Sequence, residues 1–341
     1  MGGGRATIYD IAEEAGVSIA TVSRVLRGES SVSEKTKEKV AAAIAHFNYH
    51  PSSIARGLTS NVTHSLGIVL PKLLNPNYAM IFTGAQETAR KMGYTISLFP
   101  WSSLNVSGSD PAMTLVSRRL DGLIVCVEYL PREQDELLRT ALEQFRQLMP
   151  VVLIGCVPPD YDLPYVTNNM ADMMKEIVAY LVSLGHERIA FIGGTDGDTD
   201  PHRRDVGYEE GLKEAQLPYI SSYRVYGKAT AEAGKAALKG LLDSLRQDYW
   251  PTAVIAINDL VAMGCQAAAR EKGIRMPEEM SIIGCDNLFC SPYLVPALTS
   301  VDTHQQKIGS RAVEMLIHRE NAREQGDWEL VIRDSCARVK S

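Results

Sequence analysis

The chain has 341 residues, of which 45% are hydrophobic, and a formal net charge of −6 at pH 7. This length favours two or three domains, and no apolar run approaches the roughly 20 residues of a membrane span. The N-terminus has no apolar signal segment, and the six cysteines form no CxxC pair. We therefore expect a cytoplasmic protein with reduced thiols and with neither a metal site nor a cofactor.

The charge is distributed unevenly along the chain. Residues 1–60 carry seven Lys/Arg and six Asp/Glu, whereas the remainder has a net charge of −7. Total charge therefore gives no indication of nucleic-acid binding. Only the placement of Arg24, Arg27 and Arg56 on candidate contact surfaces could favour it.

Three short helices are predicted within residues 7–47. Thr7, Ser18 and Ser33 are suitable N-caps for them, and Gly16 is suited to end the first. The turn between the first two helices is only about two residues long, as in a helix-turn-helix. The second helix, VSIATVSRVL, has an apolar side and an opposite side of small residues, hydroxyls and Arg24, which raises the question of what the second side binds.

A short helix is predicted from Pro51 to about Leu58, followed by a polar linker over 59–65. Because helix nucleation is costly, eight residues cannot hold a helix alone in water. We expect this segment to be helical only when something else supports it.

From Leu66 onward, apolar strand patterns alternate with helical ones. This alternation predicts parallel sheets covered by helices on both faces. Two such series indicate two similar α/β subdomains with a ligand cleft at the carboxyl ends of their strands. The expected strands are LGIVL (66–70), YTISLF (94–99), GLIVCV (122–127), VVLIG (151–155), RIAFIGG (188–194), YRVY (223–226), TAVIAI (252–257) and MSIIGC (280–285). Helices are expected near 76–92, 111–120 and 133–148.

These motifs together resemble the lac repressor/galactose repressor family of bacterial transcription regulators. The similarity covers nearly the whole chain and is densest in TIYDIAEEAGVSIATVSRVL and NYHPSSIARGL. Further matches are NPNYAMIFTGAQETARKMGYTI, DGLIV, LGHERIAFIGG, RRDVGYEEGL, PTAVIAINDLVAMG, GCDN and PALTSVD. Departures are Asn168-Asn169 in place of Asp-Asn, Ser52 after the hinge proline, and residues 100–110.

The resemblance implies a homodimer with a helix-turn-helix headpiece, a hinge helix and a core similar to periplasmic sugar-binding proteins. We expect the headpiece at 1–50, the hinge and linker at 51–65 and the core at 66–341. Within the core, the first subdomain is expected at 66–165 plus 292–324, and the second at 166–291 plus 325–341.

An α-helix fits the DNA major groove, so the exposed side of VSIATVSRVL is interpreted as a DNA-reading surface. Ile19 and Ala20 suit thymine methyl groups, and Arg24 can form two hydrogen bonds with a guanine. Hydroxyl groups suit phosphate oxygens; these belong to Thr7, Ser18, Thr21 and Ser23, and the resemblance adds Ser33, Thr36 and Tyr49. It also implies that Leu58 wedges into a minor-groove step, supported by Arg56. A solvated, capped helix would explain the hydroxyls equally well.

An effector is expected between the core subdomains. The candidate residues follow strands or begin helices at the cleft: Asn75, Asn77, Tyr78, Trp101, Arg204, Asn258, Asp259 and Asp286. Carboxylates, amides, an arginine and an aromatic wall suit a sugar or sugar derivative, and a nucleoside or purine is the second choice. For Asp259 a purely helix-capping role is an open alternative.

Two other classes of protein are disfavoured. An enzyme would need a motif that is absent, because the chain has no P-loop, no GxGxxG after its first strand and no GxSxG. A pure ligand receptor would need a signal peptide and no headpiece. We expect a repressor of transcription, although an activator would be built from the same domains. No leucine heptad follows the core, so a dimer is expected rather than a tetramer.

Overall fold

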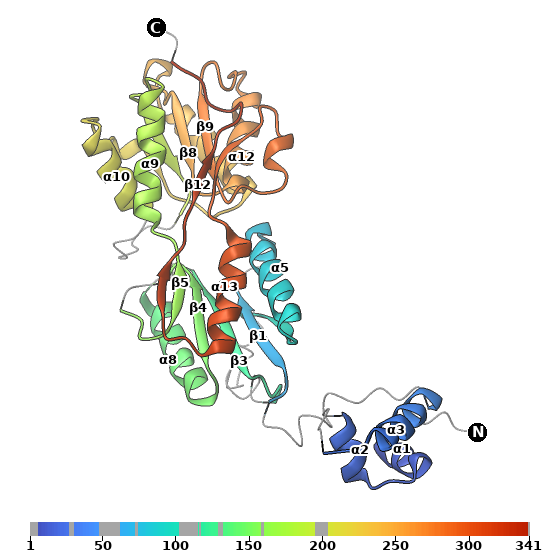
Figure 1. Cartoon of the computed structure of the whole chain (residues 1–341). Helices are drawn as coiled ribbons and strands as arrows, with labels where there is room; N and C mark the ends of the chain where they lie inside the picture. Colours follow the sequence, from blue (N-terminus) through green and yellow to red (C-terminus); the bar gives the residue numbers. More distant parts are fainter. Residues whose placement is uncertain are drawn as a thin grey trace. The chain divides into compact units, whose positions relative to one another are not determined.

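The computed structural model describes residues 6–26, 31–47, 62–71, 74–101, 115, 117–128, 132–157, 160–194 and 204–339. The chain divides into two compact units, Met1–Thr63 and His64–Ser341 (Figure 1). The hinge helix, Tyr49, Arg56, Leu58 and half of the helix expected at 111–120 lie outside the described residues, and residues 117–119 form a turn and not a helix. Within the described part, no helix is both long and apolar enough to cross a membrane.

The described residues of the first unit form three short helices, α1 (Ile8–Ala15), α2 (Ile19–Leu26) and α3 (Glu34–His46). The predicted caps are confirmed: Thr7 and Asp10 form a reciprocal capping box, and Gly16 ends α1 at φ 63°. Val22 on α2 is fully buried against the apolar sides of α1 and α3. This packing leaves the opposite side of α2 exposed.

The second unit contains two six-stranded sheets. All strands of the first sheet are parallel, in the order β11-β5-β4-β3-β1-β2. Its strands are β1 (Ser65–Leu70), β2 (Thr95–Pro100), β3 (Gly122–Val127), β4 (Val151–Gly155), β5 (Tyr165–Thr167) and β11 (Arg323–Gln325). Helices α5 (Pro76–Lys91) and α13 (Gln305–His318) cover one face, and α8 (Arg132–Leu148) covers the other (Figure 1). Side chains alternate between these faces, as Ile68 and Val69 show.

The second sheet has the matching order β12-β10-β9-β8-β6-β7, with β12 antiparallel to β10. Its strands are β6 (Ile189–Ile192), β7 (Arg224–Val225), β8 (Ala253–Ala256), β9 (Ser281–Cys285), β10 (Thr299–Asp302) and β12 (Glu329–Val331). Helices α9 (Met170–Ser183) and α10 (Arg204–Glu214) pack on one face, and α11 (Ala231–Ser244) and α12 (Asp259–Glu271) on the other. Three 3-10 turns complete the subdomain: Ser221–Tyr223, Gln247–Tyr249 and Ser291–Tyr293.

The predicted α/β architecture with two doubly wound sheets is confirmed, and each of the eight expected strands is present. The expected return to the first subdomain at residue 292 is wrong, because β10 pairs with β9 and keeps the chain in the second sheet up to Asp302. The chain therefore crosses between the sheets after Thr167, after Asp302 and after Gln325. Asn168 at the first crossing and Thr303 at the second line the cavity described below.

Candidate DNA-binding and effector sites

The exposed side of α2 carries Ile19, Ala20 and Arg24, and Ile19 is 40% exposed although it is apolar. Most of the hydroxyl groups predicted to contact phosphate lie at helix N-termini. Ser18 Oγ accepts the N–H of Thr21 at 3.1 Å, and the two hydroxyls are 2.9 Å apart. Free helix N–H groups and the helix dipole favour anions at such positions.

The other predicted headpiece residues have similar positions. Ser33 caps α3, and its hydroxyl lies 2.9 Å from that of Thr36. Thr7 caps α1, and Ser23 lies half-buried in the middle of α2. Thr7, Ser18 and Ser33 thus serve as caps, and capping does not explain the exposure of Ile19, Ala20 and Arg24.

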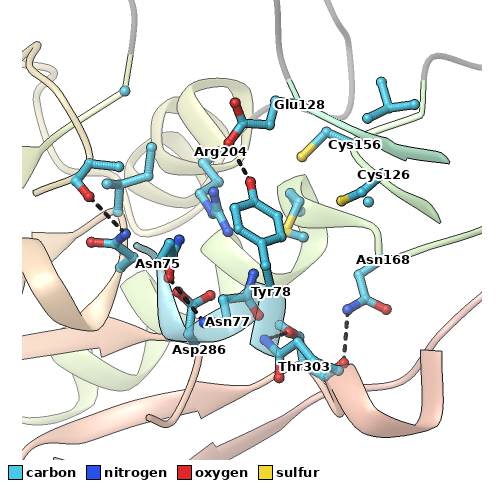
Figure 2. A pocket seen from close by; sticks show the side chains of 18 of the residues that line it. Asn75, Asn77, Tyr78, Cys126, Glu128, Cys156, Asn168, Arg204, Asp286 and Thr303 are labelled. Atoms are coloured by element: carbon cyan, nitrogen blue, oxygen red, sulfur yellow. Dashed lines mark hydrogen bonds between the residues drawn. The ribbon is translucent and has the colours of Figure 1, made fainter. Parts of the chain in front are cut away.

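A cavity of about 530 Å³ lies at the carboxyl ends of both sets of strands. Six of the eight predicted effector residues line it, from both subdomains (Figure 2). They are Asn75, Asn77, Tyr78, Arg204, Asn258 and Asp286. A cavity of this size, at the switch points of two α/β sheets, is typical of a small-molecule site.

Helix N-termini place many of these side chains. Asn75 caps α5 and accepts the N–H of Asn77 at 3.1 Å. Asn258 caps α12, accepts the N–H of Val261 at 2.9 Å, and donates to the carbonyl of Ala229. Because each cap follows a strand at the same edge of its sheet, capping chemistry concentrates amides around the cavity.

The wall from the first subdomain combines an aromatic ring, a carboxylate and two thiols. Tyr78 donates a hydrogen bond through its hydroxyl to Glu128, and Cys126 and Cys156 lie beside them (Figure 2). Burial raises the pKa of Tyr78 and that of the Cys126 thiol well above their ordinary values. Both groups are therefore neutral, and this wall presents the carboxyl group of Glu128 beside the amides of Asn75 and Asn77.

The wall from the second subdomain is more polar. Arg204 begins α10 and donates to the Cys285 thiol, with Nη2 and Sγ 3.6 Å apart. Asp286 follows β9 with a φ of 107°, in the left-handed region that few side chains adopt. Burial, reinforced by the charge of Asp259, raises the pKa of Asp286 to about 8 despite the opposing effect of Arg204. Asp286 therefore enters the cavity largely as a protonated carboxyl at neutral pH.

Two of the predicted effector residues do not line the cavity. Asp259 is fully buried, and its carboxylate accepts hydrogen bonds from the Leu288 N–H (2.8 Å) and the hydroxyls of Ser291 and Ser300 (2.5 Å each). Burial raises its pKa to about 6 even though these bonds lower it. Asp259 thus holds the segment after β9 in place. Trp101 follows the edge strand β2 and packs against the core beneath α8.

Sequence reasoning missed the residues at the crossings. Asn168, Thr303 and Gln305 all line the cavity, and the Asn168 amide donates to the carbonyl of Thr303 at 3.2 Å. Gln305 in turn donates to the Thr303 hydroxyl. The signal was weak because β5 and β10 have only three and four residues.

The buried histidine after α9, His186, has structural surroundings. His186 is buried, and its ring nitrogens lie 3.0 Å from Thr252 Oγ1 and 2.9 Å from Ser281 Oγ. Burial lowers its pKa, so the ring is neutral. All six cysteines are free thiols, and no three His, Cys, Asp or Glu side chains among the described residues converge to hold a metal ion.

Comparisons with known proteins agree with this architecture. Residues 7–52 match the family model "Bacterial regulatory proteins, lacI family", and residues 178–336 match "Periplasmic binding protein-like domain". Catabolite control protein A of Priestia megaterium is 34% identical over 91% of each chain. The HTH-type transcriptional repressor PurR of Haemophilus influenzae (strain PittEE) is 33% identical over 98% of this chain and 99% of its own.

Solved structures extend the similarity to the whole fold. The lac repressor dimer bound to operator and the anti-inducer ONPF matches 98% of this chain and all of that one, with a TM-score of 0.85 at 26% identity. A CelR–cellobiose complex matches 97% of this chain with a TM-score of 0.70 at 26% identity. The chain belongs to the lacI family of bacterial regulatory proteins, and it is a DNA-binding transcriptional repressor under the control of an effector, not an enzyme.

Proposed function

We propose that the exposed side of α2 reads base edges in the major groove of a pseudo-palindromic operator. Ile19 and Ala20 would contact thymine methyl groups, and Arg24 would bind a guanine through two hydrogen bonds. The observation that supports this assignment is an exposed isoleucine beside an exposed arginine, opposite the fully buried Val22. A helix face with no partner would not need that combination.

Operator selection from random duplex DNA tests the assignment. Arg24→Ala should lower the affinity for the selected site by about 1–3 kcal/mol and relax base preference at one symmetric pair of positions. The control is Lys39→Ala, which removes an exposed cation from α3 and should keep the consensus. An unchanged consensus for Arg24→Ala would refute Arg24 as a base reader.

The protein is proposed to act as a homodimer in the bacterial cytoplasm, where its operator lies, with one α2 per half-site. Two symmetric half-sites are the natural target of a dimer with twofold symmetry. The hydroxyls of Thr7, Ser18, Thr21, Ser23, Ser33 and Thr36 would position it on phosphates, and Tyr49, Arg56 and Leu58 are proposed contacts outside the described residues. Because phosphate contacts release counterions, affinity should fall steeply with salt. Sedimentation showing a monomer on one half-site would contradict the dimer.

A sugar or sugar derivative is the proposed effector. The cavity presents amides from Asn75, Asn77 and Asn258, a guanidinium and a protonated carboxyl, which together supply both donors and acceptors for hydroxyl groups. Tyr78 is the one aromatic side chain among its described lining residues. Its ring, in the same cavity as Arg204 and Asp286, makes a nucleoside or purine the second candidate. Thermal-shift screening of sugars, sugar phosphates, nucleosides and purines separates the two.

The ligand found by that screen also tests the residues. Arg204→Ala and Asp286→Ala should each weaken its binding by about 1–3 kcal/mol, because buried polar partners are left unpaired. Trp101→Phe is the matched control, since Trp101 lies away from the cavity. Normal affinity in both cavity variants would show that the effector binds elsewhere.

A further inference from the structure

The three crossings between the core subdomains meet at one side chain, Asn168. It directly follows β5, at the first crossing, and is only 4% exposed. Its Nδ2 donates to the carbonyl of Thr303 at the second crossing, 3.2 Å away. Its Oδ1 has no hydrogen-bond partner among the described residues. The carboxamide is therefore held at one end and only packed at the other.

Gly326, at the third crossing, packs on that second end. A Cβ built on Gly326 would lie 2.3 Å from Asn168 Oδ1, well inside van der Waals contact. The Gly326 N–H also donates to the carbonyl of Thr167 at 2.7 Å, which ties the third crossing to the first. The φ of Gly326 is outside the left-handed region, so an alanine there is opposed by the contact with Asn168 and not by the backbone.

This arrangement also touches the cavity. Asn168, Thr303 and Gln305 all line it, and Gln305 donates to the Thr303 hydroxyl. A ligand that breaks the hydrogen bonds among these residues, or that binds the unpaired oxygen of Asn168, would shift all three crossings together. Small shifts at such a hinge become large changes of angle, because the packed subdomains move as rigid bodies.

We propose that Asn168 is a positioning residue that clasps the three crossings through Thr303 and Gly326 and thereby sets the angle between the core subdomains. A role of this clasp in telling the DNA-binding unit whether an effector is bound rests on the function proposed above. The clasp itself does not, because the angle can be measured without DNA or ligand.

The test is a double-mutant cycle on the full chain, read as a distance. Spin labels are placed by unnatural amino acids at Leu137 on α8 and Lys239 on α11, two exposed positions in different subdomains. Labelled protein is mixed with excess unlabelled protein so that only distances within one chain are recorded. Asn168→Ala should broaden the distance distribution, and Gly326→Ala should shift its mean.

In the double variant, Gly326→Ala should add no further shift, because the atom it collides with is gone. Asn169→Ala is the matched control: this neighbour caps α9 and should leave the distribution as in the unmodified protein. If Asn168→Ala does not fold, Asn168→Ser replaces it, since the shorter side chain removes both the Oδ1 atom near Gly326 and the amide donor to Thr303. A wild-type distribution in Gly326→Ala, or an equal shift in both backgrounds, would overturn the clasp.

Operator binding by the same variants separates this proposal from the preceding one. Each should still bind the selected operator, while the ratio of affinities with and without the screened effector should fall from a value of about 5–150 towards one. If the unmodified protein bound no operator at all, the proposed function would be refuted, but the distances measured between the subdomains would still support the clasp. An unchanged ratio with a changed distance would refute transmission through Asn168.

Discussion

The two core subdomains share one architecture but bury different chemistry. Their sheets have matching strand orders, and helices cover both faces of each. In the described residues, every buried charged side chain lies in the second subdomain: Arg224, Asp259 and Asp286. The first subdomain buries hydrocarbon and thiols, with polar Asn168 and Gln305 only at the crossings.

This difference shows that two subdomains with the same strand order can be stabilised by different interactions. Hydrophobic burial can stabilise either sheet, but charged groups taken out of water are tolerated only with partners or a shifted pKa. The second subdomain meets that condition through the ion pair of Arg224 with Asp205 and the hydrogen bonds to Asp259. It should therefore be the more sensitive of the two to charge and pH.

The largest effect is expected from removing a core aromatic ring. Phe145 and Phe191 are both fully buried, one in each subdomain. Replacing either by alanine should lower the free energy of unfolding by about 3–5 kcal/mol. Phe191→Ala should cost more, because its ring also carries the Arg224 guanidinium at 4.1 Å. Urea denaturation measures both, and a larger loss in Phe145→Ala would reverse the comparison.

Removing a cation sharpens the comparison next. Arg224 pairs with Asp205 at 2.8 Å, and the two side chains are 3% and 14% exposed. Arg224→Met should cost about 3 kcal/mol, because it removes the buried guanidinium that pairs with the mostly buried carboxylate of Asp205. Arg139 pairs with Asp135 at 2.7 Å and also stacks on a ring, but its side chain is 36% exposed. Arg139→Met should cost less than about 1 kcal/mol, and equal losses would show that burial is not the deciding factor.

The pH dependence of stability should come from the second subdomain. The pKa values of Asp259 and Asp286 are raised to about 6 and about 8, above the ordinary value of an unfolded chain. Their contribution is complete at acidic pH and is lost as pH rises through these values, by at most about 1.4 kcal/mol per pH unit and group. The free energy of unfolding, measured by chemical denaturation, should therefore decline less steeply in Asp286→Asn over the roughly two pH units between pH 6 and pH 8. The same slope in both proteins would argue against a buried, protonated Asp286.

The smallest effect is expected where the subdomains are alike. Asn75 caps α5 in the first, and Asn258 caps α12 in the second. Each accepts one backbone N–H, so Asn75→Ala and Asn258→Ala should each cost about 1 kcal/mol. Thermal unfolding should show nearly equal losses. A several-fold difference would mean that the subdomains differ in more than their buried charges.

The cavity could be predicted in outline from sequence, and the errors follow from side-chain direction. Six lining residues were predicted because each follows a long apolar strand or begins a helix. Asp259 was placed wrongly because it is one residue after Asn258, and a helix turns about 100° per residue. That rotation carries its side chain towards β9 and β10. Trp101 was placed wrongly because β2 is the edge strand, whose end lies far from the centre of the sheet.

By itself, the sequence determined the class of fold, the three capped helices of the first unit and the eight apolar strands. These depend on periodicity and capping, which act over a few neighbouring residues. The tertiary structure alone decided which sheet takes β10, that β5 and β11 pair, and that Asn168, Thr303 and Gly326 meet. Strands of three or four residues carry too little pattern to be recognised, and they form because neighbouring strands supply their hydrogen bonds. The crossings, and with them the angle between the subdomains, are therefore set by contacts between segments more than 130 residues apart.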